Sequence, residues 1–330
     1  MIWLTWRQHR MEALGAVILL AIVGAFLLFT GLSTRNIFDS HVQACLTERG
    51  DAYLRHGCQG ILRNFENDAD YNGLIGYLNF LPALIGVFAG APMVAREIER
   101  GTHRLVWTQG VTRLRWISTK LALLAVGSVA VSVAFTAMMT WWRYPIDQVQ
   151  GRFLPSGFDF EGVAPIAYGL FAFALGAAMG TVMRRTVVAM AVTLLLFLAV
   201  RLPVEGLVRP HYLASVTTAI SAAAPDPRAD GAGNWILQGG LMDQAGHKLN
   251  NGQLSQVYSD AAAAKGNAPK GSSGFDFDAY LQVRGYVSFA EYQPADRFWT
   301  FQGIEAAFYV GLAVLLLGFT AWWVRSRSAG

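Results

Sequence analysis

Residues 13–32 read ALGAVILLAIVGAFLLFTGL, twenty consecutive positions without an ionisable side chain. An α-helix rises about 1.5 Å per residue, so a run of this length crosses the roughly 30 Å hydrocarbon core of a bilayer. Three further runs also lack Asp, Glu, Lys and Arg: residues 73–94, 121–142 and 163–183. Two more runs, residues 186–206 and 301–324, carry charges only near one end, namely Arg201, Glu205 and Glu305. The sequence therefore predicts an all-α membrane protein with six transmembrane helices.

The composition argues against a soluble enzyme. Of the 330 residues, 54% are hydrophobic and 15% charged, whereas soluble domains carry about 25% charged residues. The first run follows Arg7, His9 and Arg10, as the apolar region of a signal peptide would. It is longer than such a region, however, and no Ala-x-Ala site closes it. We expect it to remain as a membrane anchor.

The basic residues predict the orientation. If the N-terminus is cytoplasmic, the inner segments hold 12 of the 26 Lys and Arg in 46 residues, and these segments are 1–12, 95–120, 184–185 and 325–330. Only three acids, Glu12, Glu97 and Glu99, fall on that side. Because cytoplasmic loops are enriched in Lys and Arg, both termini are predicted to be cytoplasmic.

The outer segments under this orientation are residues 33–72, 143–162 and 207–300. The first contains Cys45 and Cys58, and the chain has no other cysteine. Disulfides persist in oxidising compartments, whereas a zinc site would require two further ligands, for which only His41 and His56 are near. We expect a disulfide, worth about 3 kcal/mol in the chain-entropy model, and no metal site.

Two segments are predicted to lie at the membrane surface. Residues 1–12 mix Trp3 and Trp6 with basic side chains, which favours an interfacial helix that acts as an aromatic anchor or, alternatively, as an elbow that passes force to the first span. In residues 207–300, the largest outer segment, the first half is rich in Ala, Gly, Pro and Asp and indicates a loop with little core. Its second half is aromatic, as expected for packing at headgroup level.

Polar side chains inside the spans have two interpretations. Ser128, Ser132, Thr136 and Thr140 recur at every fourth position, so they share one helical face. They either bond back to carbonyls one turn earlier, which we favour, or line a translocation path. Arg201 is expected to snorkel to the outer surface or, alternatively, to line that path, for which Glu305 is a further candidate. Glu305 requires either protonation or a cationic partner, for which Arg201 is preferred to Arg297. Gly86 with Gly90, and Gly176 with Gly180, predict close helix packing.

Residues 96–104 read REIERGTHR, between the second and third spans. Topogenic charge alone explains the basic residues of this segment but not its acids or its Gly-Thr break. The stretch Glu99-Arg100-Gly101-Thr102, followed by Thr112-Arg113 and by Lys120 at the third span, resembles the permease subunits of type-2 ATP-binding-cassette (ABC) exporters. Residues 292–305, YQPADRFWTFQGIE, resemble the last-span region in an actinobacterial branch of that family.

This resemblance implies a short cytoplasmic coupling helix that docks on a separate ATPase subunit. The residues assigned to coupling are Arg96, Glu97, Glu99, Arg100, Gly101, Thr102, Arg104 and Arg113. It also implies two ATPase copies, a second identical or related permease, the lipid bilayer as environment and the bacterial plasma membrane as location, with no nucleic-acid partner.

The chain lacks a Gly-x-x-x-x-Gly-Lys-Ser/Thr loop, so we expect it to bind no cofactor and to be no enzyme itself, with ATP and Mg²⁺ bound by the partner. The predicted function is export of an amphipathic or lipid-like substrate, such as a drug, antibiotic, peptide or lipid. One alternative is a mechanotransmitting or sensory ABC subunit that transports nothing and acts through its large outer loop. A membrane-embedded enzyme comes last, because His-Glu-x-x-His and Gly-x-Ser-x-Gly motifs are missing.

Overall fold

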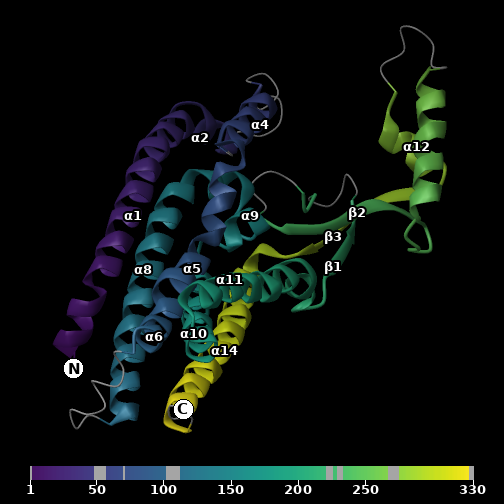
Figure 1. Ribbon diagram of the computed structural model, residues 1–330. Helices are drawn as coiled ribbons and strands as arrows, with labels where there is room; N and C mark the ends of the chain where they lie inside the picture. The colour runs from purple at the N-terminus through teal and green to yellow at the C-terminus, as the bar shows by residue number, and fades with distance from the viewer. Residues whose placement is uncertain are drawn as a thin grey trace.

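The computed structural model describes residues 2–47, 57–69, 71–101, 112–220, 226–228, 233–266 and 275–326. The chain is mostly helical (Figure 1). Within the described residues, six helical segments are long and apolar enough to cross a membrane: Trp6–Leu46, Ile75–Glu99, Arg113–Gln150, Ala164–Met183, Thr186–His211 and Ala295–Ser326. Each contains the core of one predicted span, because uninterrupted apolar runs are a strong helix signal.

The first span is longer than predicted. Helix α1 (Ile2–Ile37) runs through the predicted interfacial segment, then continues as the π-turn η1 (Phe38–Val42) and as α2 (Gln43–Thr47). Residues 2–12 therefore form one continuous helix with the first span, and their predicted place at the membrane surface stays a prediction. No Gly or Pro stands between residues 2 and 14 to interrupt the helix. In the predicted outer loop, α4 (Cys58–Ala69) follows.

The second span combines four short helical pieces. They are the 3₁₀ segment η2 (Tyr71–Phe80), α5 (Leu81–Ile85), the π-turn η3 (Gly86–Gly90) and α6 (Ala91–Glu99). The third span, α8 (Arg113–Gln150), begins at the N-cap Thr112, whose hydroxyl accepts a hydrogen bond from the Arg115 N–H at 3.3 Å. Helices α6 and α8 therefore reach into the predicted segment 95–120 from both sides.

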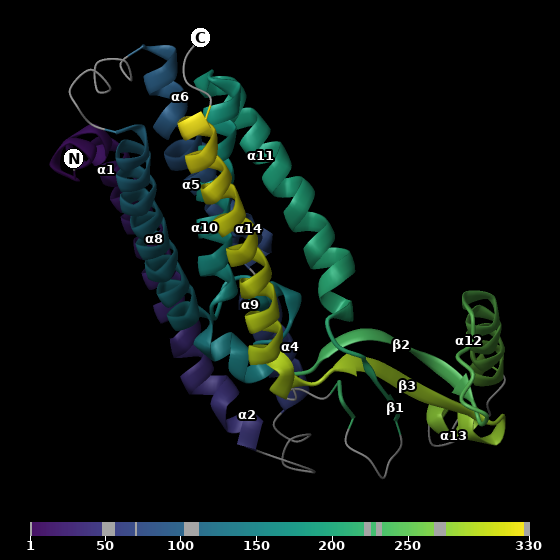
Figure 2. The ribbon, with the colours of Figure 1, turned by 90° about the horizontal axis from the view of Figure 1, so that it is seen from below.

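Helix α10 (Ala164–Met183) lies at the centre of the bundle (Figure 2). Glycines bring it against the second span: a Cβ added to Gly176 would lie 2.2 Å from the carbonyl oxygen of Gly86. A Cβ on Gly180 would lie 2.3 Å from the carbonyl oxygen of Ala91. The predicted close packing through small residues is confirmed.

The last two spans flank α10. A tight turn with Arg184 at φ 58° leads into α11 (Thr186–Pro203), which continues through the π-turn η4 (Val204–Val208) and the 3₁₀ turn η5 (Arg209–His211). The sixth span is α14 (Phe298–Ser326), which follows the 3₁₀ turn η6 (Ala295–Arg297). The short helix α9 (Pro155–Phe158) lies in the connection between α8 and α10.

The segment between the fifth and sixth spans contains a β-sheet, so the prediction of an all-α protein is wrong for this segment. Its first half, predicted to be a loop with little core, contains strands. Strands β1 (Val216–Ala219), β2 (Trp235–Asp243) and β3 (Tyr286–Gln293) form an antiparallel sheet in the order β1-β3-β2. The β2–β3 ribbon projects from the bundle and carries α12 (Asn251–Gly266) and α13 (Phe277–Val283) (Figures 1 and 2). Leu241, Val257 and Leu281 form the small core of this arm.

The bundle has two distinct ends. We call the end with the first turn of α1, the last turn of α6 and the last turn of α14 the terminal end, and the opposite end, next to the sheet, the sheet end (Figure 2). At the sheet end, a disulfide joins Cys45 of α2 to Cys58 of α4, with both cysteines buried. The predicted disulfide is confirmed.

Candidate functional site

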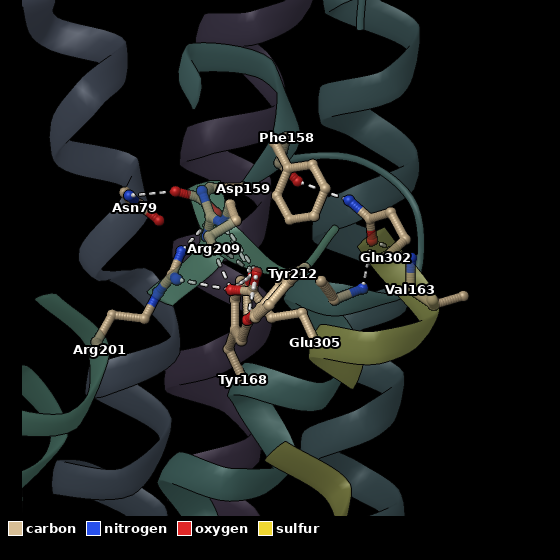
Figure 3. A network of polar contacts seen from close by, with 11 residues as sticks. Asn79, Phe158, Asp159, Val163, Tyr168, Arg201, Arg209, Tyr212, Gln302 and Glu305 are labelled. Carbon is tan, nitrogen blue, oxygen red and sulfur yellow. Dashed lines mark hydrogen bonds and ion pairs between the residues drawn. The ribbon is translucent and has the colours of Figure 1, made fainter. Parts of the chain in front are cut away.

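Four buried charged side chains meet at the sheet end of the bundle (Figure 3). Asp159 follows α9, Arg201 lies on α11, Arg209 on η5 and Glu305 on α14, and none is more than 3% exposed. We call these residues the ion quartet. Burying an unpaired charge in a membrane protein costs several kcal/mol, so such residues mark a structural or functional centre.

Each arginine of the quartet contacts both acids. Arg209 donates to Glu305 through Nε and Nη2, at 2.8 Å each, and to Oδ1 of Asp159 at 2.6 Å. Arg201 lies 2.6 Å from Oδ1 of Asp159 and 3.2 Å from Oε1 of Glu305. The two positive and two negative charges therefore neutralise one another. The prediction that Glu305 pairs with Arg201 is confirmed, but Arg209 is a second partner that it did not include.

The π-turn explains why two arginines eight residues apart face the same way. In a regular α-helix such residues point about 80° apart. Pro203 has no N–H to donate, and η4 (Val204–Val208) follows it directly. A π-turn accommodates one extra residue, so Arg201 and Arg209 behave as if seven residues apart, within about 20° of the same direction.

Neutral side chains complete the network. The Tyr168 hydroxyl donates to Glu305 at 2.7 Å, and its ring stacks with the Arg201 guanidinium at 3.9 Å from the ring centroid. The amide of Asn79, in the second span, donates to Asp159 at 3.3 Å. The network thus joins the second, fourth, fifth and sixth spans. Burial would raise the pKa of Asp159, but Arg201 and Arg209 hold it below its ordinary value.

Gln302, one turn before Glu305 on α14, fixes the start of α10. Its Oε1 accepts from the backbone N–H groups of Val163 at 3.0 Å and Ala164 at 2.7 Å, and its amide donates to the Phe158 carbonyl at 2.9 Å. These are the unpaired backbone donors of a helix N-terminus, which a side chain of another helix satisfies here. The loop that carries Asp159 is thereby held against α14 (Figure 3).

The hydroxyls predicted on one face of the third span lie in different surroundings. Ser128 donates to the Leu124 carbonyl at 2.8 Å, which is the back-bonding that we favoured. Ser132 and Thr136 are buried, and Ser132 lies so close to Gly169 that a Cβ there would stand 2.0 Å from its hydroxyl oxygen. Thr140 is exposed. A translocation path along these residues stays a prediction.

A second group of polar contacts gathers at the terminal end, around the last turn of α6. Arg96 pairs with Glu12 of α1 at 2.6 Å, and Glu97 pairs with the buried Lys120 of α8. Glu99 accepts hydrogen bonds from the backbone N–H of Thr186 at 3.1 Å and from its hydroxyl at 2.7 Å. The end of α6 is therefore joined to the first, third and fifth spans.

Comparison with known proteins identifies the family. A family model described as "ABC-2 membrane transporter related" matches residues 17–209, more than half of the chain. The chain belongs to this family. Neither the curated proteins nor the solved structures contain a match. The chain is thus a multi-pass ABC-2 permease, a component of a transporter, and the matched region ends at Arg209 of the ion quartet.

The coupling segment of this ABC-2 permease differs from the prediction in one respect. Residues 96–99 do not begin a separate helix: they end α6, which stops at the exposed Arg100, before Gly101 at φ 69°. Thr102 and Arg104 lie outside the described residues, and Arg113 starts α8. Glu97 and Glu99, which topogenic charge does not explain, both have partners within the permease, and their role in coupling stays a prediction.

Sequence reasoning missed Asp159, Tyr168 and Arg209 at the ion quartet. Asp159 and Arg209 fall outside the apolar runs, so they were counted as loop residues. Counting charges would not have identified Asp159, because Glu205 lies between Arg201 and Arg209 and, with Glu305, already balances both arginines in the sequence.

Proposed function

We propose that this ABC-2 permease is the membrane-spanning part of an ATP-driven exporter, driven by a separate ATPase subunit that docks at its terminal end. The observation that carries the proposal is the last turn of α6. Arg96, Glu99 and Arg100 are exposed there, yet contacts of Arg96, Glu97 and Glu99 join this turn to three other spans. A partner that displaced the last turn of α6 would therefore act on several helices at once.

The remaining parts of the proposal follow from the charge distribution and the family. In this proposal the terminal end lies in the cytoplasm, because the short segments at that end are rich in Lys and Arg. The disulfide and the sheet then lie on the outer side of a bacterial plasma membrane, where disulfides persist. ATP and Mg²⁺ are bound by two ATPase subunits, because this chain has no phosphate-binding loop. A second permease, identical or related, completes the pathway.

The proposed cargo is amphipathic or lipid-like. A strongly polar cargo needs a polar lining through the membrane, whereas the intramembrane charges Arg201 and Glu305 are committed to each other and to Asp159 and Arg209. Large apolar side chains face outward along several spans, for example Phe29, Val187 and Leu315. Such surfaces suit exchange of an apolar molecule with the bilayer.

Reconstitution in vesicles tests the function. The purified permease alone should hydrolyse no ATP, and the permease with its ATPase subunit should hydrolyse ATP faster when an amphipathic cargo is added. Fluorescent lipid or drug analogues should then move toward the side that bears the sheet. Movement in the opposite direction, or ATP turnover by the permease without any ATPase, would contradict the proposal.

The projecting arm favours one second candidate, a mechanotransmitting subunit. The β2–β3 ribbon extends well beyond the bundle (Figure 1). Asp243 and Tyr286 form the last pair of this ribbon before the chain continues to α12 and α13. A two-residue Asn-Gly turn can therefore replace residues 244–285 without changing the strand register. Export should survive this deletion. If cargo movement is absent in both forms and only an outer partner's response is lost, mechanotransmission is the function.

A further inference from the structure

Helix α11 is fastened by polar contacts at both of its ends. Thr186, in its first turn, contacts Glu99 at the terminal end, and Arg201 and Arg209, at its last turns, belong to the ion quartet at the sheet end. The 23 residue steps from Thr186 to Arg209 correspond to about 35 Å of helix, enough to cross the hydrocarbon core.

The contact at the terminal end replaces an ordinary helix cap. Arg185 is the N-cap residue of α11, and its side chain makes no capping hydrogen bond. The carboxylate of Glu99, which belongs to the second span, supplies the acceptor instead and places a negative charge at the positive end of the helix dipole. The first turn of α11 is therefore bound to the last turn of α6.

Between its ends α11 presents a narrow and largely smooth face to the bundle. Its buried residues Ala189, Thr193 and Phe197 recur at every fourth position. Ala189 packs against alanines of α6, and Phe197 stacks on Phe171 of α10 with ring centroids 6.0 Å apart. Both contacts are apolar, so between its polar ends little directional bonding opposes a shift of α11 along its neighbours.

We propose that α11 is a lever between the coupling segment and the ion quartet, with Glu99 as the positioning residue that passes displacement of α6 to Arg201 and Arg209. The proposal rests on the proposed function in one respect, namely that the ATPase subunit supplies the displacement. The mechanical link itself belongs to this chain.

The ion quartet is suited to respond sharply to such a displacement. Its hydrogen bonds to Arg209 are 2.6 to 2.8 Å long, and hydrogen bonds of this kind weaken steeply with length and angle. A shift of α11 that lengthened them would release the fifth span from Asp159 of the outer loop and from Glu305 of the sixth span. The sheet end would then be free to open when the coupling segment moves.

Distance measurements on the full chain in lipid nanodiscs, without any ATPase, test the link. Spin labels on Leu207→Cys of η4 and Val133→Cys of α8 report the position of the outer end of α11, since α8 lies on the other side of the bundle (Figure 2). Both sites are exposed, and the native cysteines are held in their disulfide. The spin-labelled chain that retains Glu99 should give one narrow distance distribution.

Glu99→Ala should add a second distance population, because the first turn of α11 is released. Glu99→Gln retains an acceptor oxygen and should restore the single population. Glu12→Ala, the matched control, breaks the contact of α6 with α1 and should leave the distribution unchanged. A Glu99→Ala distribution identical to the wild type would overturn the proposal, as would an equal change in Glu12→Ala.

Two further measurements complete the test. If Glu99→Ala does not fold, Thr186→Val removes the hydroxyl donor alone; it should likewise add a second distance population, and an unchanged distribution would overturn the lever. Adding the ATPase subunit and ATP should shift the wild-type distances but not those of Glu99→Ala. Because the distance measurements on the variants need no ATPase, failure of the ATPase subunit to bind would refute the proposed function without affecting the lever.

Discussion

Replacing Glu305 by glutamine should strongly destabilise the permease. Glu305 is fully buried and accepts hydrogen bonds from Arg209, Arg201, Tyr168 and Tyr212. In Glu305→Gln, two guanidinium groups share the single carboxylate of Asp159, and the new amide N–H₂ faces donors. Breaking a buried ion pair by removing one partner costs about 3–5 kcal/mol.

Thermal unfolding in nanodiscs, followed by tryptophan fluorescence, measures this loss. With a shift of about 2 °C per kcal/mol, the lower end of the range for large domains, Tm should fall by about 6–10 °C. Glu291→Gln is the matched control: Glu291 pairs with Lys248 on the partly exposed sheet, where an ion pair is worth at most about 1 kcal/mol. Its Tm should change by about 2 °C or less.

A double variant separates loss of charge balance from loss of packing. Arg209→Met combined with Glu305→Gln leaves one arginine and one acid, so it should recover part of the Tm lost in Glu305→Gln. The reasoning is refuted if Glu305→Gln unfolds within 2 °C of the wild type, or if the double variant loses as much as the two single variants together.

Three more predictions concern other parts of the molecule. Gly176→Val should abolish folding of the bundle, seen as aggregation in size-exclusion chromatography, because its Cβ would stand 2.2 Å from a carbonyl oxygen of the second span; a monodisperse variant would contradict the packing. Replacing both cysteines by serine should cost about 3 kcal/mol in unfolding free energy, and unchanged Tm would show that the disulfide contributes nothing. The lowered pKa of Asp159 contributes stability that is present above its unfolded pKa of about 3.8 and is lost as pH falls through the lower folded value. The Tm difference between the wild type and Asp159→Asn should thus be constant from about pH 5 to 8 and shrink only below about pH 4, and a loss already near pH 6 would contradict it.

The apolar runs were sufficient to predict the six spans and the approximate depth of each. The bilayer requires length and apolarity from every spanning helix, and both are local properties of the sequence. The disulfide and the Glu305–Arg201 pair were also predictable, since each had few available partners. What local patterns could not supply were the helix ends, because α1 and α8 extend well beyond their apolar cores.

The ion quartet, the Glu99 contact and the sheet could not be predicted, because they depend on contacts between segments far apart in the sequence. Asp159 and Arg209 lie in loop-like sequence and become buried only when four spans meet. Glu99 and Thr186 are 87 residues apart, and nothing local indicates that one caps the helix of the other. Strand β2 contains the adjacent Gly239 and Gly240, which weaken the strand signal until β3 pairs with it.

Site-specific crosslinking from Arg100 tests the central claim, that an ATPase subunit drives this permease through the end of α6. Arg100 is exposed at the terminal end, and Val283, 89% exposed on the arm, is the control site at the other end. A photoreactive residue at position 100 should join the permease to a polypeptide whose peptides include a Gly-x-x-x-x-Gly-Lys-Ser/Thr loop, and position 283 should not. Failure to crosslink such an ATPase from position 100, or equal crosslinking from position 283, would contradict the account.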